Sequence, residues 1–272
     1  MNYLLYRGPS LLNDEPIKVI AAGVDTPSQN PKTGPMVHTY ILVDEESPQD
    51  AVKSGKDERI CGNCIHRGQG EKSRSCYVNL TRGPKQAWEA PAADPRPGLA
   101  AYRFARIGTY GDPAAVPYAI WEALLEDASG FTGYTHQWRG CDQRLQRICM
   151  ASVETPAEMR EAQSLGWRTY RAVDPAAPLQ VLQNETQCPA QTAGAQCVAC
   201  LACSGTSRRQ NHIVARAHGI SWIKANFTKN LKRSKRGASP PSNSLRSAPT
   251  PPRSTTYAAS EGRITQTTPN TL

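Results

Sequence analysis

The sequence lacks any long hydrophobic run. No stretch of 18 or more apolar residues occurs, so none has the length of a membrane-spanning helix. The first residues reach proline and acidic residues too soon for a secretory signal peptide. Signatures of common enzymes are missing as well, among them G-x-S-x-G, H-E-x-x-H, G-x-G-x-x-G, the Walker phosphate loop and paired catalytic carboxylates. We therefore expect a cytoplasmic protein without membrane contact, and a hydrolase has no support.

Acidic residues are scarce relative to basic ones, and the formal net charge is +9. Residues 229–272 alone carry +7, which leaves about +2 for the rest of the chain. This basic segment is rich in proline, serine and threonine, and it cannot bury enough apolar surface to offset the entropy of ordering. We predict a domain at 1–228 and a disordered tail at 229–272, and weak contact with nucleic acid is the functional alternative for the tail.

Nine cysteines in a reducing compartment favour metal ligands or redox groups over a disulfide framework. Three of them, Cys61, Cys64 and Cys76, follow a C-x2-C-x11-C pattern in which His66 comes two residues after the second cysteine. A C-x-x-C turn brings two thiols to one side of a loop, where they can bind one ion. We predict a metal site here whose fourth ligand is His66, a distant residue or a substrate. A redox pair is the alternative.

Basic residues lie between the cysteines of this first group, at Arg67, Lys72 and Arg74. Positive charge stabilises a thiolate relative to a thiol. The sequence therefore predicts a lowered thiol pKa in the first group.

A second group of cysteines follows a C-x8-C-x2-C-x2-C pattern and is the most specific signal in the chain. Four thiols suffice for a complete four-coordinate site that holds zinc or an iron–sulfur cluster. The members of this group are Cys188, Cys197, Cys200 and Cys203. Cys141 and Cys149 lie near expected strands and are interpreted as small buried hydrophobic residues.

Runs rich in β-branched residues alternate with helical patterns along most of the chain, which predicts an α/β fold with a mainly parallel sheet. About eight strands suggest a barrel or part-barrel with cysteine-rich loops, and a doubly wound sheet is the alternative. The expected strands include 17–25, 36–44, 100–113, 131–138, 147–155, 168–174, 179–190 and 209–219. Helices are expected at 114–130 and at 156–166, the second one capped by Thr155.

Polar residues at the carboxyl ends of parallel strands form the usual ligand sites of such folds. In the segment RIGTYGDP we predict that Gly108, Gly111 and Asp112 bind a cofactor, with a tight turn as the alternative. Asp112 and His136 are the candidate catalytic residues, because each follows an expected strand. A structural histidine is the alternative for His136.

The segments ICGNCIHR, RIGTYGDPAAVP, GYTHQW and CVACLAC together resemble an uncharacterised family carried by phages and plasmids. The resemblance covers roughly residues 15–220. It implies a protein of a mobile genetic element, and it brings no established activity. The tail departs from the family pattern, so no function is assigned to it.

The order of these motifs also resembles radical S-adenosylmethionine enzymes. In that family a three-cysteine loop follows the first barrel strand, and a glycine- and acid-rich step that holds the methionyl amine ends the second. The resemblance implies a reactive cluster at the first cysteine group and an auxiliary cluster at the second. The Cys-x3-Cys-x2-Cys spacing of the family is absent here.

Two functions from different classes therefore stand as hypotheses. The first is a metalloprotein with two cysteine sites that hold iron–sulfur clusters or zinc, acting on a small-molecule substrate as a redox enzyme with S-adenosylmethionine as cofactor. The second is a zinc-stapled protein that binds nucleic acid or a host factor without catalysis. A metal-free chain with buried or redox-active thiols is a third interpretation.

Overall fold

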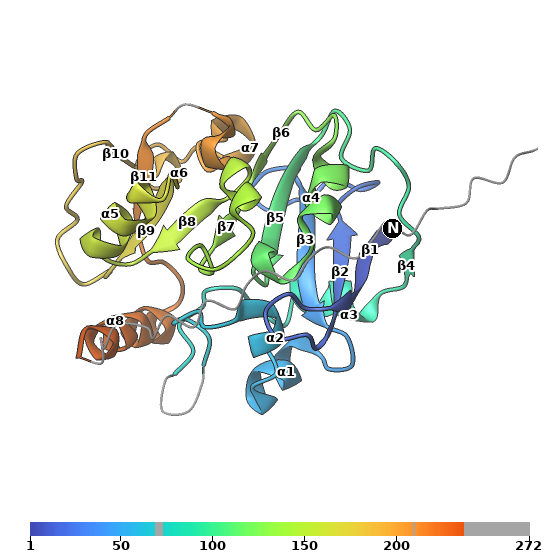
Figure 1. The fold of residues 1–272 in the computed structure, drawn as a ribbon, viewed down its shortest axis with the longest axis horizontal. Helices are drawn as coiled ribbons and strands as arrows, with labels where there is room; N and C mark the ends of the chain where they lie inside the picture. The colour runs from blue at the N-terminus through green and yellow to red at the C-terminus, as the bar shows by residue number, and fades with distance from the viewer. Residues whose placement is uncertain (69–72, 209, 237–272) are drawn as a thin grey trace, which may run out of the picture. The chain divides into compact units, whose positions relative to one another are not determined.

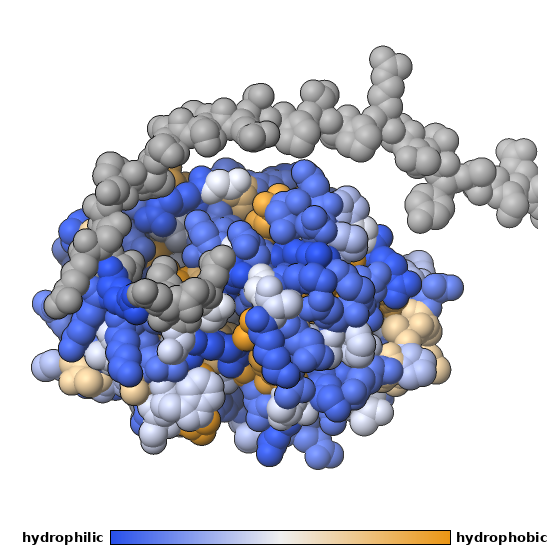
Figure 2. All heavy atoms as spheres, turned by 90° about the horizontal axis from the view of Figure 1, so that it is seen from below, coloured by the Kyte–Doolittle hydropathy of each residue, from blue (hydrophilic) through white to orange (hydrophobic). Residues whose placement is uncertain are grey.

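The computed structural model describes residues 1–68, 73–208 and 210–236, and contacts gather Met1–Gly237 into one compact unit. Within the described part, no helix has the length and hydropathy needed to cross a membrane. The face shown in Figure 2 is mainly hydrophilic, with hydrophobic residues in small separate patches. Exposed apolar residues scattered in this way are normal for a globular protein surface.

The first sheet of the described residues has the strand order β4-β1-β2-β3-β5-β6 (Figure 1). The pairs β1–β2 and β2–β3 are antiparallel, whereas β4–β1, β3–β5 and β5–β6 are parallel. The connections between these antiparallel strands contain no helix that would carry the chain across the sheet. The strands are β1 (Asn2–Pro9), β2 (Pro16–Ala22), β3 (Val37–Val43), β4 (Ala92–Ala93), β5 (Phe104–Tyr110) and β6 (Gly130–Thr132).

The second sheet has the order β10-β11-β9-β8-β7, and all of its pairs are parallel. Both sheets together confirm the predicted α/β fold with mainly parallel strands. The described strands do not close into a barrel, because β4 and β10 each pair on one side only. The strands are β7 (Tyr134–Thr135), β8 (Met150–Val153), β9 (Thr169–Val173), β10 (Glu185–Gln187) and β11 (His212–Arg216).

A single residue, Gly133, joins the two sheets, because it lies between β6 of the first and β7 of the second. Its amide donates to the carbonyl of Cys203 at 3.1 Å, and its carbonyl accepts from the amide of Met150 at 2.9 Å. The strand predicted over 131–138 is thus present but divided at this glycine.

Helices and short turns of helix connect the strands, and the core includes the fully buried Trp121, Trp138 and Trp167. The helix α5 begins as predicted: Thr155 caps it, and Glu158 completes a capping box. The connecting elements are α1 (Pro48–Ser54), α2 (Glu58–Cys61), α3 (Gly83–Glu89), η1 (Pro113–Ala115), α4 (Tyr118–Leu125), η2 (Gln143–Arg147), α5 (Pro156–Ser164), α6 (Pro189–Thr192), α7 (Cys197–Cys200) and η3 (Gly205–Ser207).

The last described element is a helix that the sequence analysis missed, α8 (Ser221–Arg236). Ile223, Phe227 and Leu231 recur every four residues and are buried. Burial of each such side chain stabilises the folded state by about 1.5–3 kcal/mol. This gain offsets the conformational entropy of ordering, on which the prediction of disorder was based. The predicted boundary at 228/229 is therefore wrong, because residues 229–236 are helical. The remainder of the predicted tail, 237–272, lies outside the described residues.

Candidate metal centres

The loop from Cys61 to Cys76, here called the cysteine loop, starts at the end of α2 and is held by a buried arginine. The guanidinium of Arg67 donates to Asp57 Oδ1 at 2.9 Å and to the carbonyls of Gly55 and Gly62 at 2.7 and 3.1 Å. Arg67 is therefore engaged with an acid and the backbone and supports the shape of the loop. Lys72 lies outside the described residues.

The end of the cysteine loop returns to its beginning. The carbonyl of His66 accepts hydrogen bonds from the amides of Ser75 and Cys76, at 3.0 and 2.9 Å. Electrostatic contacts then join all three pairs among Cys61, Cys64 and Cys76. The three cysteines are thus close enough to interact electrostatically, and the metal site predicted for them stays a prediction.

Burial is the main cause of the pKa shifts of Cys61 and Cys76. It raises the pKa of Cys61 well above the ordinary value, and nearby Cys64 and Asp57 raise it further. Burial also raises the pKa of Cys76, although Arg74 opposes this effect. The predicted lowering of the thiol pKa by basic residues is therefore wrong for these two cysteines. Both a redox pair and a metal site use thiolates, so the raised pKa does not distinguish these two interpretations.

A histidine–glutamate cluster, made of His66, His136 and Glu154, lies beside the cysteine loop. One ligand atom from each side chain lies within 4.8 Å of the other two, so these three residues have the arrangement of a metal site. Glu154 Oε1 is 3.1 Å from His66 Nε2 and 3.3 Å from His136 Nε2. Burial alone would raise the pKa of Glu154, but its contacts with the two imidazoles lower the pKa to about 2. The carboxyl group is therefore ionised.

His136 connects this cluster to the cysteine loop. Its pKa is raised well above the ordinary value, because contacts with Cys64 and Glu154 outweigh the opposing effect of burial. Its Nε2 atom is buried and has no partner with hydrogen-bond geometry among the described residues, in spite of the short distance to Glu154. The structure thus places two predicted residues, His66 and His136, around a common point.

Asp112 follows β5, as predicted, but its carboxylate is fully engaged with the protein. Oδ1 accepts from Thr135 Oγ1 at 2.6 Å and from the amide of Ala114 at 3.0 Å, while Oδ2 accepts from the amide of His136 at 2.7 Å. Burial raises the pKa of Asp112, against these hydrogen bonds. Asp112 therefore caps η1 and positions the backbone of His136, which supports the tight-turn alternative, and its role in catalysis or cofactor binding stays a prediction.

Gly108 and Gly111 pack against the protein itself. Both have positive φ angles, +63° and +80°. A Cβ at Gly108 would lie 2.8 Å from Pro113, and a Cβ at Gly111 would lie 2.6 Å from Ile41. These contacts explain both glycines through packing, without the predicted cofactor.

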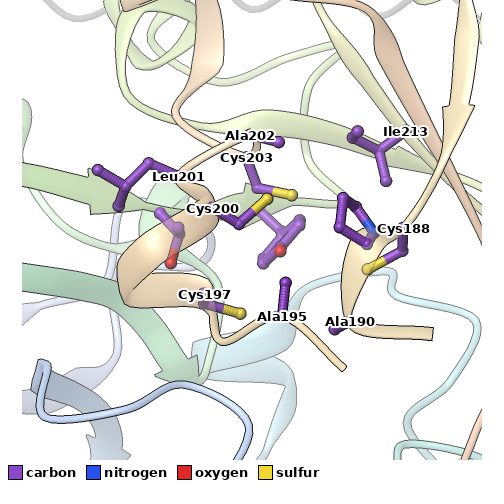
Figure 3. Close-up of a pocket in the computed structure, with 12 residues that line it drawn as sticks. Cys188, Ala190, Ala195, Cys197, Cys200, Leu201, Ala202, Cys203 and Ile213 are labelled. Atoms are coloured by element: carbon purple, nitrogen blue, oxygen red, sulfur yellow. The ribbon is translucent and has the colours of Figure 1, made fainter. Parts of the chain in front are cut away.

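The second cysteine group surrounds one small cavity of about 30 Å³, here called the four-cysteine pocket. Figure 3 shows the four sulfur atoms around this common space. Thr132 and Tyr134 line the pocket as well, and burial raises the pKa of Cys203 to about 12 in spite of a hydrogen bond from Tyr134. The cysteines of the pocket are Cys188 after β10, Cys197 and Cys200 in α7, and Cys203 after it.

The sulfur atoms of the cysteine groups are not arranged for a single small ion. Among the described residues, no group of three cysteines has all of its sulfur atoms within 4.8 Å of one another. All nine cysteines are free thiols. Cys149 is buried in the core, as predicted, and Cys141 is partly buried.

A buried arginine lies close to the four-cysteine pocket. Arg106 on β5 donates to Tyr77 Oη at 3.3 Å, and its guanidinium lies 5.1 Å from the centre of the Tyr134 ring. Its charge also interacts with Cys197. In the part of the chain that the structure describes, no carboxylate forms an ion pair with Arg106.

Comparison of the chain with protein-family models, curated proteins and solved structures finds no match. The resemblance to phage and plasmid proteins therefore stays a prediction. Glu154 is the residue of the site that sequence reasoning did not assign. The sequence feature that could have identified Glu154 is its position at the end of an expected strand, next to the helix cap Thr155.

Proposed function

We propose that this chain is a redox-active iron–sulfur protein, with one cluster in the four-cysteine pocket and a second at the cysteine loop. One observation carries the proposal: all four cysteines of the second group line a single cavity, although they come from separate segments between β10 and η3. Thiolates are the ligands that hold iron–sulfur clusters in proteins. The alternative interpretation of these cysteines as scattered buried residues does not account for their convergence.

The spacing of the cysteine sulfur atoms differs from that of a single zinc site. Zn–S bonds of about 2.3 Å place the sulfurs of a tetrahedral site about 3.8 Å apart. Within the part of the chain that the structure describes, no three cysteine sulfurs all lie within 4.8 Å of one another. An iron–sulfur cluster puts several iron and sulfide ions between its thiolates, so those thiolates stand further apart than the ligands of one zinc ion.

The charge near the pocket also supports a metal–thiolate centre. Four thiolates around one zinc ion, or around an oxidised iron–sulfur cluster, leave a net negative charge. A buried cation without a partner is costly, and Arg106 has no ion pair with a described carboxylate. Its interaction with Cys197 gives that cation a negative partner when the four cysteines bind a metal.

The first prediction is that the chain purified without oxygen contains iron and acid-labile sulfide in equal amounts. We expect a brown protein with broad visible absorption that bleaches on reduction, because thiolate-bound iron–sulfur clusters absorb in this range. Elemental analysis and a sulfide assay on the same sample provide the measurement. A colourless protein with stoichiometric zinc would contradict the proposal.

As an enzyme, we propose that the chain uses S-adenosylmethionine. Six parallel strands follow one another in chain order across both sheets, namely β3, β5, the joined β6 and β7, β8, β9 and β11. This order supports the proposed part-barrel, and the cysteine loop follows β3 in the chain. Three thiolates leave one iron of a cluster open to a ligand. Asp112 does not serve the methionyl amine in this proposal, because both of its oxygens are engaged.

The second prediction is that the reduced protein cleaves S-adenosylmethionine. An iron–sulfur cluster in the cysteine loop would supply one electron, taken from dithionite, to break the bond between the sulfonium sulfur and C5′. The products would be methionine and a 5′-deoxyadenosyl radical, which takes a hydrogen atom from a C–H bond of the substrate, or of the protein when no substrate is present, and ends as 5′-deoxyadenosine, with the unpaired electron left on that carbon. Chromatography of both products measures the reaction, and the Cys64→Ala variant is the control. If the brown protein forms neither product, the enzyme proposal fails while the clusters remain.

The second candidate function is a nucleic-acid binding protein whose fold is held together by zinc. The composition of α8 favours this candidate. This helix carries six basic residues and no acidic residue, so part of the positive charge belongs to the folded domain. The prediction of a nearly neutral folded part is therefore wrong. A zinc-containing, colourless protein would make this candidate the one to pursue, through the salt dependence of its affinity for DNA and RNA.

A further inference from the structure

We infer that the histidine–glutamate cluster binds one divalent first-row transition ion, such as Fe²⁺ or Mn²⁺, through two imidazoles and one carboxylate. This site lies next to the cysteine loop, since His136 contacts Cys64, but its three ligands are not cysteines. Two histidines and one carboxylate form the ligand set of mononuclear iron sites that keep positions open for water or substrate. Three atoms within 4.8 Å of one another meet the distance requirement for a shared ion.

The three ligands come from separate parts of the fold that meet at one edge. His66 lies in the cysteine loop after β3, His136 follows β7, and Glu154 follows β8. All three therefore lie after the carboxyl ends of parallel strands, where α/β folds place their ligands. The side chains of His66 and Glu154 are 10% and 6% exposed, while that of His136 is 26% exposed. The cluster is thus largely buried, with access from the side of His136.

Further contacts orient the imidazole ring of His66. Ser75 Oγ lies 2.9 Å from His66 Nδ1, and Asn230 Nδ2 donates to the same hydroxyl at 3.0 Å. The ring of Phe227 stacks on His66 at 4.7 Å. Hydrogen bonds to the ring nitrogen opposite the metal are the usual way in which proteins fix a ligating imidazole. The helix α8, which supplies Asn230 and Phe227, therefore holds His66 Nε2 toward the cluster.

The other two ligands are fixed through their backbones. Asp112 accepts the amide of His136 at 2.7 Å, and Glu158 accepts the amide of Glu154 at 3.1 Å. The buried Nε2 of His136 has no partner with hydrogen-bond geometry among the described residues, although it faces the cluster. An ion bound between the three side chains gives this nitrogen a partner and neutralises the charge of Glu154.

The test uses Mn²⁺ as the probe, on the full chain purified without oxygen. We expect one Mn²⁺ per chain by equilibrium dialysis and by the loss of the free-ion signal in electron paramagnetic resonance. The Glu154→Gln variant should bind at least 10-fold more weakly, because it loses the charged oxygen ligand. Glu161→Gln is the matched control, since Glu161 pairs with Arg139 at the surface and lies outside the cluster.

Further variants separate the possible outcomes. His136→Gln should also lose the ion, and Mn²⁺ should raise the melting temperature of the parent chain and of Glu161→Gln, but not of Glu154→Gln. Iron and sulfide are measured in every sample, so a failure of the clusters is seen independently of this site. Absence of stoichiometric Mn²⁺ binding by the parent chain overturns the inference. Equal binding by Glu154→Gln overturns it as well.

Discussion

The Cys203→Ala variant is expected to lose roughly half of the iron and sulfide of the parent chain, because each proposed centre holds one cluster. Cys203 is buried in the four-cysteine pocket, where Tyr134 donates a hydrogen bond to it. Alanine cannot ligate iron, and three remaining thiols hold a cluster less firmly than four. Iron and sulfide per chain, measured together with the visible spectrum, check this expectation.

The matched control is Cys149→Ala. Cys149 is also buried, but it belongs to the hydrophobic core and to neither cysteine group. We expect it to keep its full iron content and to lose about 1 kcal/mol of stability, which is typical of a core substitution. Equal iron in Cys203→Ala and the parent would exclude a cluster in the four-cysteine pocket.

Replacement of Arg171 by methionine is expected to lower the free energy of unfolding by about 3–5 kcal/mol. Arg171 on β9 forms a two-bond ion pair with Glu185 on β10: Nε lies 2.7 Å from Oε1, and Nη2 lies 2.6 Å from Oε2. Both side chains are buried, at 5% and 0% exposure. The substitution leaves the carboxylate of Glu185 without its partner in the protein interior. Urea denaturation followed by circular dichroism measures the change.

The double variant Arg171→Met/Glu185→Leu tests the cause of this loss. It removes both charges, so most of the lost stability should return. A double variant as unstable as Arg171→Met would show that packing, and not the unpaired charge, accounts for the effect. The measurement does not depend on any metal proposal, because neither residue lines a candidate centre.

Local sequence signals predicted much of the fold. The capping pattern of Thr155, Pro156 and Glu158 located the start of α5, because its hydrogen bonds form within one turn of the chain. The runs around β2, β3 and β5 are rich in β-branched residues, and all three are strands. The direction of β2 against β3 was not predicted, because strand patterns contain no information about direction.

The features that the sequence did not predict depend on contacts between residues that are far apart in the chain. The helix α8 has weak signals of its own and is stabilised by packing, in which Asn230 donates to the carbonyl of Ser73 at 2.9 Å. Glu154 became a candidate ligand only when the fold brought it within 3.1 Å of His66. Asp112 looked like a site residue because the sequence did not show that Thr135 and His136 would occupy its oxygens.

The junction at Gly133 has a consequence for unfolding. The chain passes through this residue from β6, an edge strand of the first sheet, into β7, an edge strand of the second. The two sheets are therefore covalently connected at these edges. A Cβ at this position would lie 2.5 Å from Ile107 on β5 and 2.9 Å from Cys149, so the junction is tightly packed on its side-chain face too. Local unfolding of one sheet would remove hydrogen-bond partners from the other sheet. We therefore expect the two sheets to unfold together, as one cooperative unit.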